Sequence, residues 1–323
     1  MRAVVVQRTG GPETLQVEEV EPPRPGPGEV AVEVAAAGVN FIDVYQRTGV
    51  YPRDLPFVAG SEGSGTVVEV GPDVDDFAAG DRVAWAMVPG AGYAERVVVP
   101  GDRCVTVPEG VDSETAAAAM LQGMTAHFLS ESTFPARSGQ TALVHAAAGG
   151  VGLLLTQMLA AKGVRVLATT STEQKAALAR EAGAAEVVHY TEADVVAEVQ
   201  RITDGRGVAV VYDGVGRSTF DASLDCLAPR GMMVLFGASS GPVPPFDPQD
   251  LNKKGSLFLT RPSLAHYIAS RGELVDRASS VFEKVAVGEL DVRVGGRYGL
   301  EEAGRAHDDL EGRRTTGKLL VVP

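Results

Sequence analysis

A run of small residues, placed between an apolar segment and a helical pattern, is the part of this sequence best suited to hold a ligand. After Thr141–His145 the chain reads Ala146-Ala147-Ala148-Gly149-Gly150-Val151-Gly152. A glycine-rich turn from a strand into a helix exposes unpaired backbone N–H groups at the positive helix end, which suits a dinucleotide pyrophosphate. Gly149 and Gly152 fit the G-x-G-x-x-G fingerprint, whereas Ala147 stands where the first glycine is expected. The sequence predicts a dinucleotide site here, with a merely tight turn as the alternative.

The following strand indicates which dinucleotide binds. NAD sites usually carry Asp or Glu about 20 residues further on, where the carboxylate bonds the ribose hydroxyl and repels a 2′-phosphate. Here the strand ends in hydroxyl residues, Ala168-Thr169-Thr170-Ser171-Thr172, and Lys175 follows one helical turn later. Glu173 is contrary evidence, although a carboxylate at a helix N-terminus also favours the helix dipole. We predict NADPH, with an ordinary solvated lysine as the alternative for Lys175.

Metal chemistry has little support in the sequence. The two cysteines, Cys104 and Cys226, and the five histidines form no C-x-x-C or H-x-x-H arrangement. A structural zinc site needs about four closely spaced ligands, so none is expected. The cysteines have apolar neighbours and are predicted to be free buried thiols. His145 ends a buried strand and is predicted to be a hydrogen-bonding core residue rather than a catalyst.

The elements that must position the small-residue turn alternate between strand and helix. Continuous apolar strands and amphipathic helices in regular alternation indicate a doubly wound parallel sheet. The predicted strands are Thr141–His145, Val164–Thr169, Glu186–His189, Val208–Tyr212, Met232–Phe236 and Leu257–Thr260. The predicted helices are Val151–Lys162, Glu173–Glu181, Ala193–Ile202 and Ser218–Leu227.

The two ends of the chain follow a different pattern. The first 110 residues contain short strands with period-two alternation, such as Val30-Ala31-Val32-Glu33-Val34, separated by turn clusters rich in Pro and Gly. Short strands at this spacing suggest a partly closed barrel. Ser113 is predicted to cap a helix through the alanine run that follows. The segment after residue 260 is too short for a third domain, so we expect it to return to the N-terminal part.

Composition narrows the class of protein. The chain has 323 residues, 45% of them hydrophobic, which supports a well-buried core and two domains. Its formal charge of −13 would be repelled by a nucleic-acid backbone, so nucleic acid is a poor partner. No apolar run reaches the length of a membrane span, and no secretory signal is evident at the N-terminus. We expect a cytoplasmic protein.

Several segments in order along the chain resemble the zinc-free quinone oxidoreductases of the medium-chain dehydrogenase/reductase superfamily, including the ζ-crystallins. They are Gly38-Val39-Asn40-Phe41-Ile42-Asp43-Val44-Tyr45, Gly60-Ser61-Glu62-Gly63-Ser64-Gly65, Gly80-Asp81-Arg82-Val83, the turn at 145–152 and Thr260-Arg261-Pro262-Ser263. The resemblance covers nearly the whole chain, and the alanine-first turn is typical of this branch. Zinc-dependent relatives have Cys near the position of Asn40 and Gly-His-Glu at the position of Gly60-Ser61-Glu62, and this chain has neither.

The resemblance implies a Rossmann-type doubly wound parallel sheet, at residues 124–261, plus a GroES-like β-barrel catalytic domain made of residues 1–123 and 262–323. It implies that Asn40 and Tyr45 act at the nicotinamide, with a turn residue and a buried ring as the respective alternatives. Arg313 is followed directly by Arg314, so one of these two arginines can be merely solvated. The implied cofactor-binding residues are Asn40, Tyr45, Gly149, Gly150, Val151, Ser171, Lys175, Tyr190, Phe236, Gly237, Ala238, Ser239, Arg261 and Arg313.

The predicted function is metal-free hydride transfer from NADPH to a quinone. A quinone needs no Lewis acid because hydride uptake yields a phenolate-like anion that aromaticity stabilises. Two alternatives stay open: an NADPH-dependent reductase of the C=C bond of an enal, enone or enoyl thioester, and a low-turnover, crystallin-like NADPH-binding protein. The resemblance also implies a homodimer joined through edge strands, with Leu257-Phe258-Leu259 as a suitable apolar edge.

Overall fold

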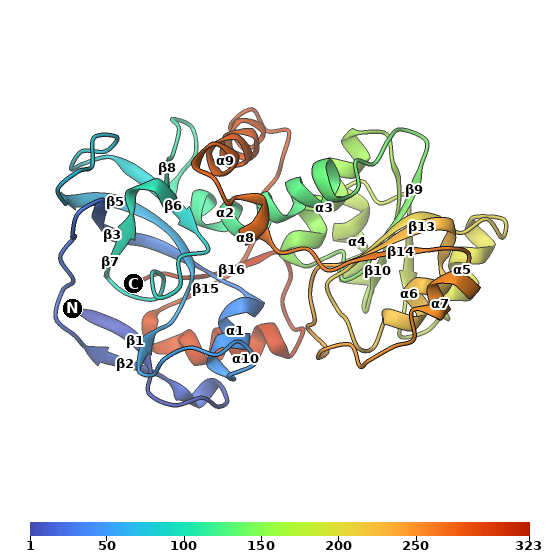
Figure 1. The fold of residues 1–323 in the computed structure, drawn as a ribbon, viewed down its shortest axis with the longest axis horizontal. Coiled ribbons are helices and arrows are strands. Elements are labelled where there is room, and N and C mark those ends of the chain that lie inside the picture. Colours follow the sequence, from blue (N-terminus) through green and yellow to red (C-terminus); the bar gives the residue numbers. More distant parts are fainter. The chain divides into compact units, whose positions relative to one another are not determined.

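The computed structural model describes residues 1–323, and the chain divides into two compact units. Met1–Met124 and Tyr267–Pro323 form the first unit, and Thr125–His266 forms the second. The C-terminal segment therefore packs with the N-terminal one, as the red strands β15 and β16 beside β3 show in Figure 1. No helix combines the length and the apolar character that crossing a bilayer requires.

The first unit is built mainly from antiparallel strands. Its larger sheet has seven strands in the order β15-β16-β3-β5-β6-β8, with β7 also paired to β3. These strands are β3 (Glu29–Val39), β5 (Glu62–Val70), β6 (Arg82–Ala86), β7 (Arg96–Pro100), β8 (Cys104–Thr106), β15 (Val294–Tyr298) and β16 (Lys318–Val321). A smaller sheet contains β1 (Arg2–Val6), β2 (Leu15–Glu19) and β4 (Phe57–Val58). The helices are α1 (Phe41–Arg47), most of α2 (Ser113–Phe128), α9 (Arg271–Ala286) and α10 (Ala303–Glu311).

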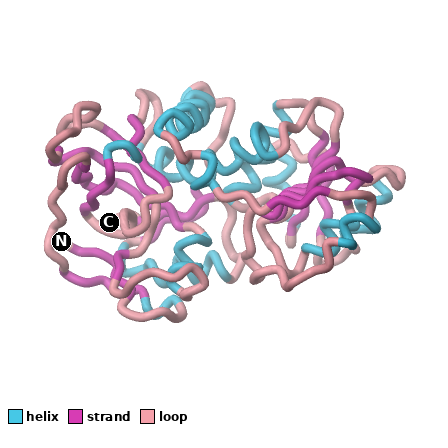
Figure 2. The backbone as a smooth tube through the Cα atoms, in the orientation of Figure 1, coloured by secondary structure: helices cyan, strands magenta, loops and turns pink.

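The second unit is a six-stranded parallel sheet with the order β11-β10-β9-β12-β13-β14. Its strands are β9 (Thr141–Val144), β10 (Arg165–Thr170), β11 (Glu186–His189), β12 (Val208–Asp213), β13 (Leu227–Leu235) and β14 (Phe258–Thr260). Its helices are α3 (Gly150–Ala161), α4 (Glu173–Glu181), α5 (Val195–Ile202), α6 (Phe220–Asp225) and α7 (Gln249–Lys253), and they lie on both sides of the sheet (Figure 2). The order reverses between β9 and β12, so this is the predicted doubly wound sheet.

Each unit has its own apolar core. In the first, alternate residues of β3, such as Val30, Val32 and Val34, belong to the same apolar cluster as Trp85. The Trp85 indole N–H donates to the Ala91 carbonyl at 2.7 Å. In the second, Leu143, Leu167 and Val211 come from the three central strands and are fully buried. The sheet strands read as continuous apolar runs because helices cover both faces.

Some local predictions were wrong. α2 (Ser113–Phe128) is capped by Asp112, whose Oδ1 accepts the Thr115 N–H at 2.9 Å, so Ser113 is already the first helical residue. α6 is shorter than predicted, because Thr219 bonds the carboxylate of Asp213 at the end of β12 and Leu227 already pairs with β12. Helix α1 was not predicted, since seven residues carry too little periodicity.

Candidate cofactor and active site

The small-residue turn follows β9 directly and leads into α3. Ala146 adopts a left-handed φ of +50°, and its carbonyl accepts the Gly149 N–H at 2.9 Å, which closes the turn. Gly149 is the residue before α3, and the Leu153 N–H is the first to bond back to it. The N–H groups of the intervening residues 150–152 therefore have no partner within the helix, as at every helix start. This is the arrangement that binds phosphate groups.

A buried carboxylate organises the loop after β12. Asp213 is fully buried, and its Oδ1 accepts the backbone N–H groups of Val215 and Gly216 at 2.7 and 3.0 Å. Its Oδ2 accepts the hydroxyls of Thr219 and Ser223 at 2.6 and 2.8 Å. Four donors compensate the burial of this charge and fix the loop at the carboxyl edge of the sheet.

Hydrogen bonds connect the same carboxylate, through Ser223, to His145, which directly precedes the small-residue turn. Ser223 gives its single proton to Asp213, so it must accept from His145 Nε2–H at 3.0 Å. The Nδ1 atom then accepts the Thr169 hydroxyl at 3.0 Å. Burial lowers the pKa of His145, which keeps the ring neutral. The residue is a buried hydrogen-bonding group, as predicted.

The end of β10 carries the residues expected at the 2′-phosphate. Ser171 and Lys175 are half-buried, and the Thr172 hydroxyl caps α4 by accepting the Lys175 N–H at 3.3 Å. The neighbouring Thr170 side chain is 2% exposed, and its hydroxyl has no partner. Tyr190 lies beside this strand end, because its N–H donates to the Thr170 carbonyl at 3.2 Å.

Glu173, the contrary evidence in the sequence, is engaged by two cationic or titratable partners. Its Oε1 bonds Arg180 at 2.5 Å and its Oε2 bonds His189 at 3.1 Å. The hydrogen bond from Arg180 lowers the pKa of Glu173, so the carboxylate is ionised but paired. Its repulsion of a second anion is therefore weakened.

Two further loops at this edge pack backbone against backbone. The Phe236 N–H donates to the Asp213 carbonyl at 2.8 Å, and the Ser239 N–H donates to the Gly214 carbonyl at 3.2 Å. A Cβ on Gly237 would lie 2.5 Å from the Gly214 carbonyl oxygen, so only glycine fits. Ala238 lies within this same loop. All strands of this sheet are parallel, so their carboxyl ends lie along one edge. The predicted cofactor residues of this unit lie at that edge: 149–151, 171, 175, 190, 236–239 and 261.

In the first unit, Asn40 is held by a buried ion pair. Its Nδ2 donates to Glu62 Oε1 at 2.7 Å and to the Gly38 carbonyl at 3.3 Å, and its Oδ1 accepts from Lys318 Nζ at 2.8 Å. Lys318 Nζ also bonds Glu62 Oε1, while Glu62 Oε2 accepts the Leu121 N–H at 2.7 Å. Both amide hydrogens of Asn40 are thus used, and one lone pair on Oδ1 is left for a ligand.

Asp43 lies one turn further along α1 and is 3% exposed. It accepts hydrogen bonds from the Asn40 N–H at 2.9 Å, the Ser61 hydroxyl at 3.1 Å and the Tyr93 hydroxyl at 3.2 Å. Burial nevertheless raises its pKa from 3.8 to about 7. Desolvation of the charged form outweighs these three bonds and the attraction of Lys318.

This shift predicts a pH-dependent contribution to stability. Between about pH 4 and pH 7 the folded state holds the Asp43 proton and the unfolded state does not, so the free energy of unfolding falls as pH rises, by up to about 4 kcal/mol. Asp43→Asn keeps the acceptor for Asn40 and Tyr93, while its amide can donate to Ser61. Denaturant titrations across this range should show the wild type losing stability relative to Asp43→Asn. Parallel curves would contradict the raised pKa.

Tyr45 and Arg313 are the other predicted site residues of the first unit. Tyr45 is half-buried, and its ring contacts those of Tyr51 and Phe41, with centroids 5.2 and 6.1 Å away. Arg313 is exposed in the loop after α10 with a left-handed φ of +55°. The adjacent Arg314 pairs with Asp308 and Asp309. In the second unit, the exposed Arg261 follows β14 and donates to the Pro262 carbonyl at 3.3 Å.

The residues at the positions of the relatives' zinc ligands do not fit a metal. The Asn40 amide is bonded to Lys318 and Glu62, and the Ser61 hydroxyl donates to Asp43. The ammonium of Lys318 already balances the Glu62 carboxylate, and no group of three or more His, Cys, Asp or Glu side chains converges elsewhere. These side chains therefore do not form a zinc site.

Sequence reasoning missed Lys318, Glu62 and Asp213 as parts of these arrangements. Asp213 had a usable signal, because a carboxylate that ends a buried parallel strand must be satisfied locally. Lys318 had none, since its partners Asn40 and Glu62 lie 278 and 256 residues away in the chain.

The fold and these residues define a two-domain oxidoreductase with a dinucleotide-binding sheet. Residues 26–109 match the family described as "Alcohol dehydrogenase GroES-like domain", and residues 150–274 match "Zinc-binding dehydrogenase". A quinone oxidoreductase of Pseudomonas aeruginosa is 45% identical over 315 residues, or 97% of each chain. The Escherichia coli quinone oxidoreductase structure complexed with NADPH has a TM-score of 0.98 at 42% identity and covers both chains fully. A 2-haloacrylate reductase of Burkholderia is 40% identical over 99% of this chain and 98% of its own.

The chain therefore belongs to the quinone oxidoreductases of the medium-chain dehydrogenase/reductase superfamily. This confirms the resemblance drawn from the segments around Asn40, Glu62 and the turn at 145–152.

Proposed function

We propose that this protein is an NADPH:quinone oxidoreductase that transfers hydride to a quinone without a metal ion. The observation that carries the function is the near full-length similarity to curated quinone oxidoreductases, together with the NADPH complex of a structural relative. The phosphate-binding turn and the paired Glu173 at the carboxyl edge support the same cofactor.

NADPH fits the residues present. The free first-turn N–H groups of α3, with Gly149, Gly150 and Val151, hold the pyrophosphate. The unpartnered, buried Thr170 hydroxyl lies at the strand end beside Ser171 and is suited to the ribose. Lys175, Ser171 and Tyr190 serve the adenosine 2′-phosphate end, and residues 236–239 serve the nicotinamide ribose. Arg261 and Arg313 bind phosphate or amide oxygens.

When bound, NADPH supplies the hydride, and the protein supplies position and a dry environment. Asn40 offers the remaining lone pair of its fixed amide to the nicotinamide or the acceptor. Tyr45 offers its ring and its hydroxyl to the same purpose. Neither residue needs to transfer a proton in the hydride step, because the reduced quinone is a stabilised anion.

Replacing Lys175 by alanine tests the cofactor preference. We expect the Kd of NADPH to rise by about tenfold or more and the Kd of NADH to change little, because a charge-assisted hydrogen bond from the half-buried Lys175 to a phosphate contributes on the order of 1.5 to 3 kcal/mol. Lys162→Ala, which removes a lysine from the other end of α3, is the matched control. Equal losses for both nucleotides would show that Lys175 does not read the 2′-phosphate.

A steady-state panel of acceptors tests the reaction itself. We expect NADPH oxidation with 1,4-benzoquinone and naphthoquinones. The relative named 2-haloacrylate reductase favours one second candidate, an NADPH-dependent reductase of activated C=C bonds, for which Tyr45 would serve as proton donor. Turnover of an alkenal but not of any quinone would select that candidate. Tight NADPH binding without turnover of any acceptor would instead support the low-turnover, ζ-crystallin-like role.

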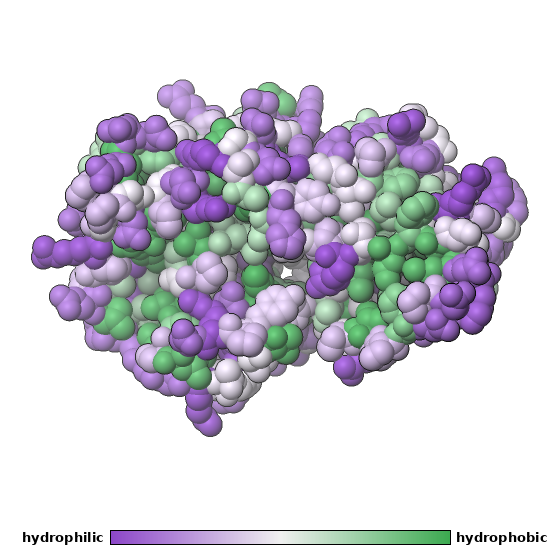
Figure 3. All heavy atoms as spheres, in the orientation of Figure 1, coloured by the Kyte–Doolittle hydropathy of each residue, from purple (hydrophilic) through white to green (hydrophobic).

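The proposal also covers the domain boundaries, the oligomeric state and the cellular location. We assign residues 1–123 and 262–323 to the catalytic domain and 124–261 to the cofactor domain, in a cytoplasmic homodimer. β14 is the edge strand of the parallel sheet, and Phe258 on it is 57% exposed. Apolar side chains also gather on the visible face over the second unit (Figure 3). Sedimentation as a monomer at micromolar concentration would refute the proposed homodimer.

A further inference from the structure

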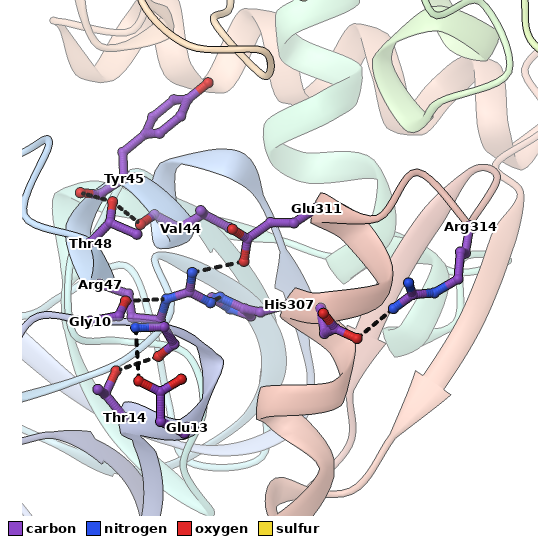
Figure 4. A network of polar contacts seen from close by, with 12 residues as sticks. Gly10, Glu13, Thr14, Val44, Tyr45, Arg47, Thr48, His307, Glu311 and Arg314 are labelled. Carbon is purple, nitrogen blue, oxygen red and sulfur yellow. Dashed lines mark hydrogen bonds and ion pairs between the residues drawn. The ribbon is translucent and has the colours of Figure 1, made fainter.

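A chain of buried polar side chains crosses the first unit from the surface to the start of α1. Figure 4 shows its outer part, from Glu311 through Arg47 to His307. Glu311 on α10 accepts from Arg47 Nη2 at 2.7 Å, and Arg47 Nη1 contacts His307 Nδ1 at 3.2 Å. His307 Nε2 lies 3.1 Å from the Tyr93 hydroxyl, which lies 3.2 Å from Asp43 Oδ2. Arg47, His307 and Tyr93 are each at most 1% exposed. Such a set of side chains is costly to bury unless every bond is made.

The direction of each bond in this chain follows from the chemistry of arginine. A guanidinium has only donors, so His307 Nδ1 must accept from Arg47 and carries no proton. The neutral ring therefore has its proton on Nε2 and donates it to Tyr93, which must donate in turn to Asp43. Burial and the nearby Arg47 charge lower the pKa of His307 to about 3, which keeps the ring neutral.

This series of hydrogen bonds fixes both ends of α1. Asp43 accepts the Asn40 N–H at the start of the helix, and Arg47 is its last residue. Arg47 also holds the N-terminal loop, because its Nε donates to the Gly10 carbonyl at 3.2 Å and its carbonyl accepts the Gly10 N–H at 3.1 Å. Figure 4 shows the Tyr45 side chain pointing away from Arg47, on the opposite side of the helix.

We propose that His307, through its Nε2–H tautomer, is a positioning residue that sets the placement of helix α1 and so of Asn40 and Tyr45. This inference rests on the proposed function, in which those two residues meet the nicotinamide or the quinone. His307 touches neither. It links the donor Arg47 to Tyr93, which donates to Asp43. This link needs one acceptor atom and one donor atom on a small rigid group.

Two substitutions at His307 separate this role from simple packing. His307→Leu fills space but leaves Arg47 and Tyr93 without partners, whereas His307→Gln keeps one acceptor and one donor on neighbouring atoms. We expect kcat with quinone to fall by at least about tenfold in His307→Leu, since small displacements of reacting groups are costly. We expect His307→Gln to recover most of that loss. Replacing the exposed His266 by leucine is the matched control.

Binding of 2′,5′-ADP provides a readout that α1 should not affect. Its Kd should stay at the wild-type value in all three variants, because the residues proposed for the adenosine 2′-phosphate end, Ser171, Lys175 and Tyr190, all lie in the second unit. A folded His307→Leu variant with wild-type kcat, or equal kcat losses in the leucine and glutamine variants, would overturn the inference. Lack of quinone turnover in the wild type would instead refute the proposed function, and the ratios would then be measured with the acceptor that is reduced.

Nitrogen NMR of the wild-type imidazole tests the tautomer without any substitution. We expect His307 to keep a protonated Nε2 and an unprotonated Nδ1 from about pH 5 to about pH 8, where an ordinary histidine titrates. A proton on Nδ1 would overturn the inference even if His307→Leu fails to fold. Tyr93→Phe, which removes the next link of the chain, should lower kcat in the same direction.

Discussion

Replacing Gly152 by valine is expected to raise the Kd of NADPH by at least about 100-fold, a loss of roughly 2.7 kcal/mol. A Cβ at this position would lie 2.4 Å from the Ala146 carbonyl oxygen and 2.7 Å from Ala147 Cα. These are backbone atoms of the turn itself, so they cannot rotate away. The turn must shift and carry with it the free N–H groups that start α3. Isothermal titration with NADPH measures the effect.

Gly272 offers a matched control for this substitution. It lies in the first turn of α9, and a Cβ there meets no atom within 4 Å. Gly272→Ala should leave NADPH binding unchanged and should not reduce stability, because alanine is the better helix former. Wild-type NADPH affinity in folded Gly152→Val would show that the turn does not bind the pyrophosphate.

The second large effect is expected at Lys318. Lys318→Met removes the ammonium that faces Glu62, which is itself fully buried, and leaves that carboxylate with only the Asn40 amide and the Leu121 N–H. Breaking a buried pair in this way typically costs about 3 to 5 kcal/mol. Urea unfolding should show a loss of that size. Lys253→Met, which breaks an exposed pair with Asp250, should cost less than about 0.5 kcal/mol.

A double variant shows whether the cost belongs to the pair. Glu62→Gln combined with Lys318→Met leaves no uncompensated buried charge, so its loss should be smaller than the sum of the two single losses. Additive losses would mean that the two side chains do not interact. The space around the pair is already full: a Cβ on Gly38 would overlap Glu62 Oε1 and Lys318 Cε.

The local parts of the fold and site were predictable. The strands and helices around the cofactor turn follow from apolar periodicity, and α4 and β11 have the predicted bounds. The turn between β9 and α3 is also a local feature, because seven consecutive residues determine its shape. Short elements such as α1 and β4 escaped prediction, since they contain too few residues to show a period.

The sequence by itself determined the class of sheet, the dinucleotide turn and the hydroxyl-rich strand end. Only the tertiary structure decided that Glu173 is paired with Arg180 and His189, that Lys318 faces Glu62, and that His307 joins Arg47 to Tyr93. Periodicity reports which face of an element is buried, and it carries no information on which buried polar groups meet. Those partners come from chain segments up to several hundred residues apart, and each bond exists only once both segments are folded against the same core.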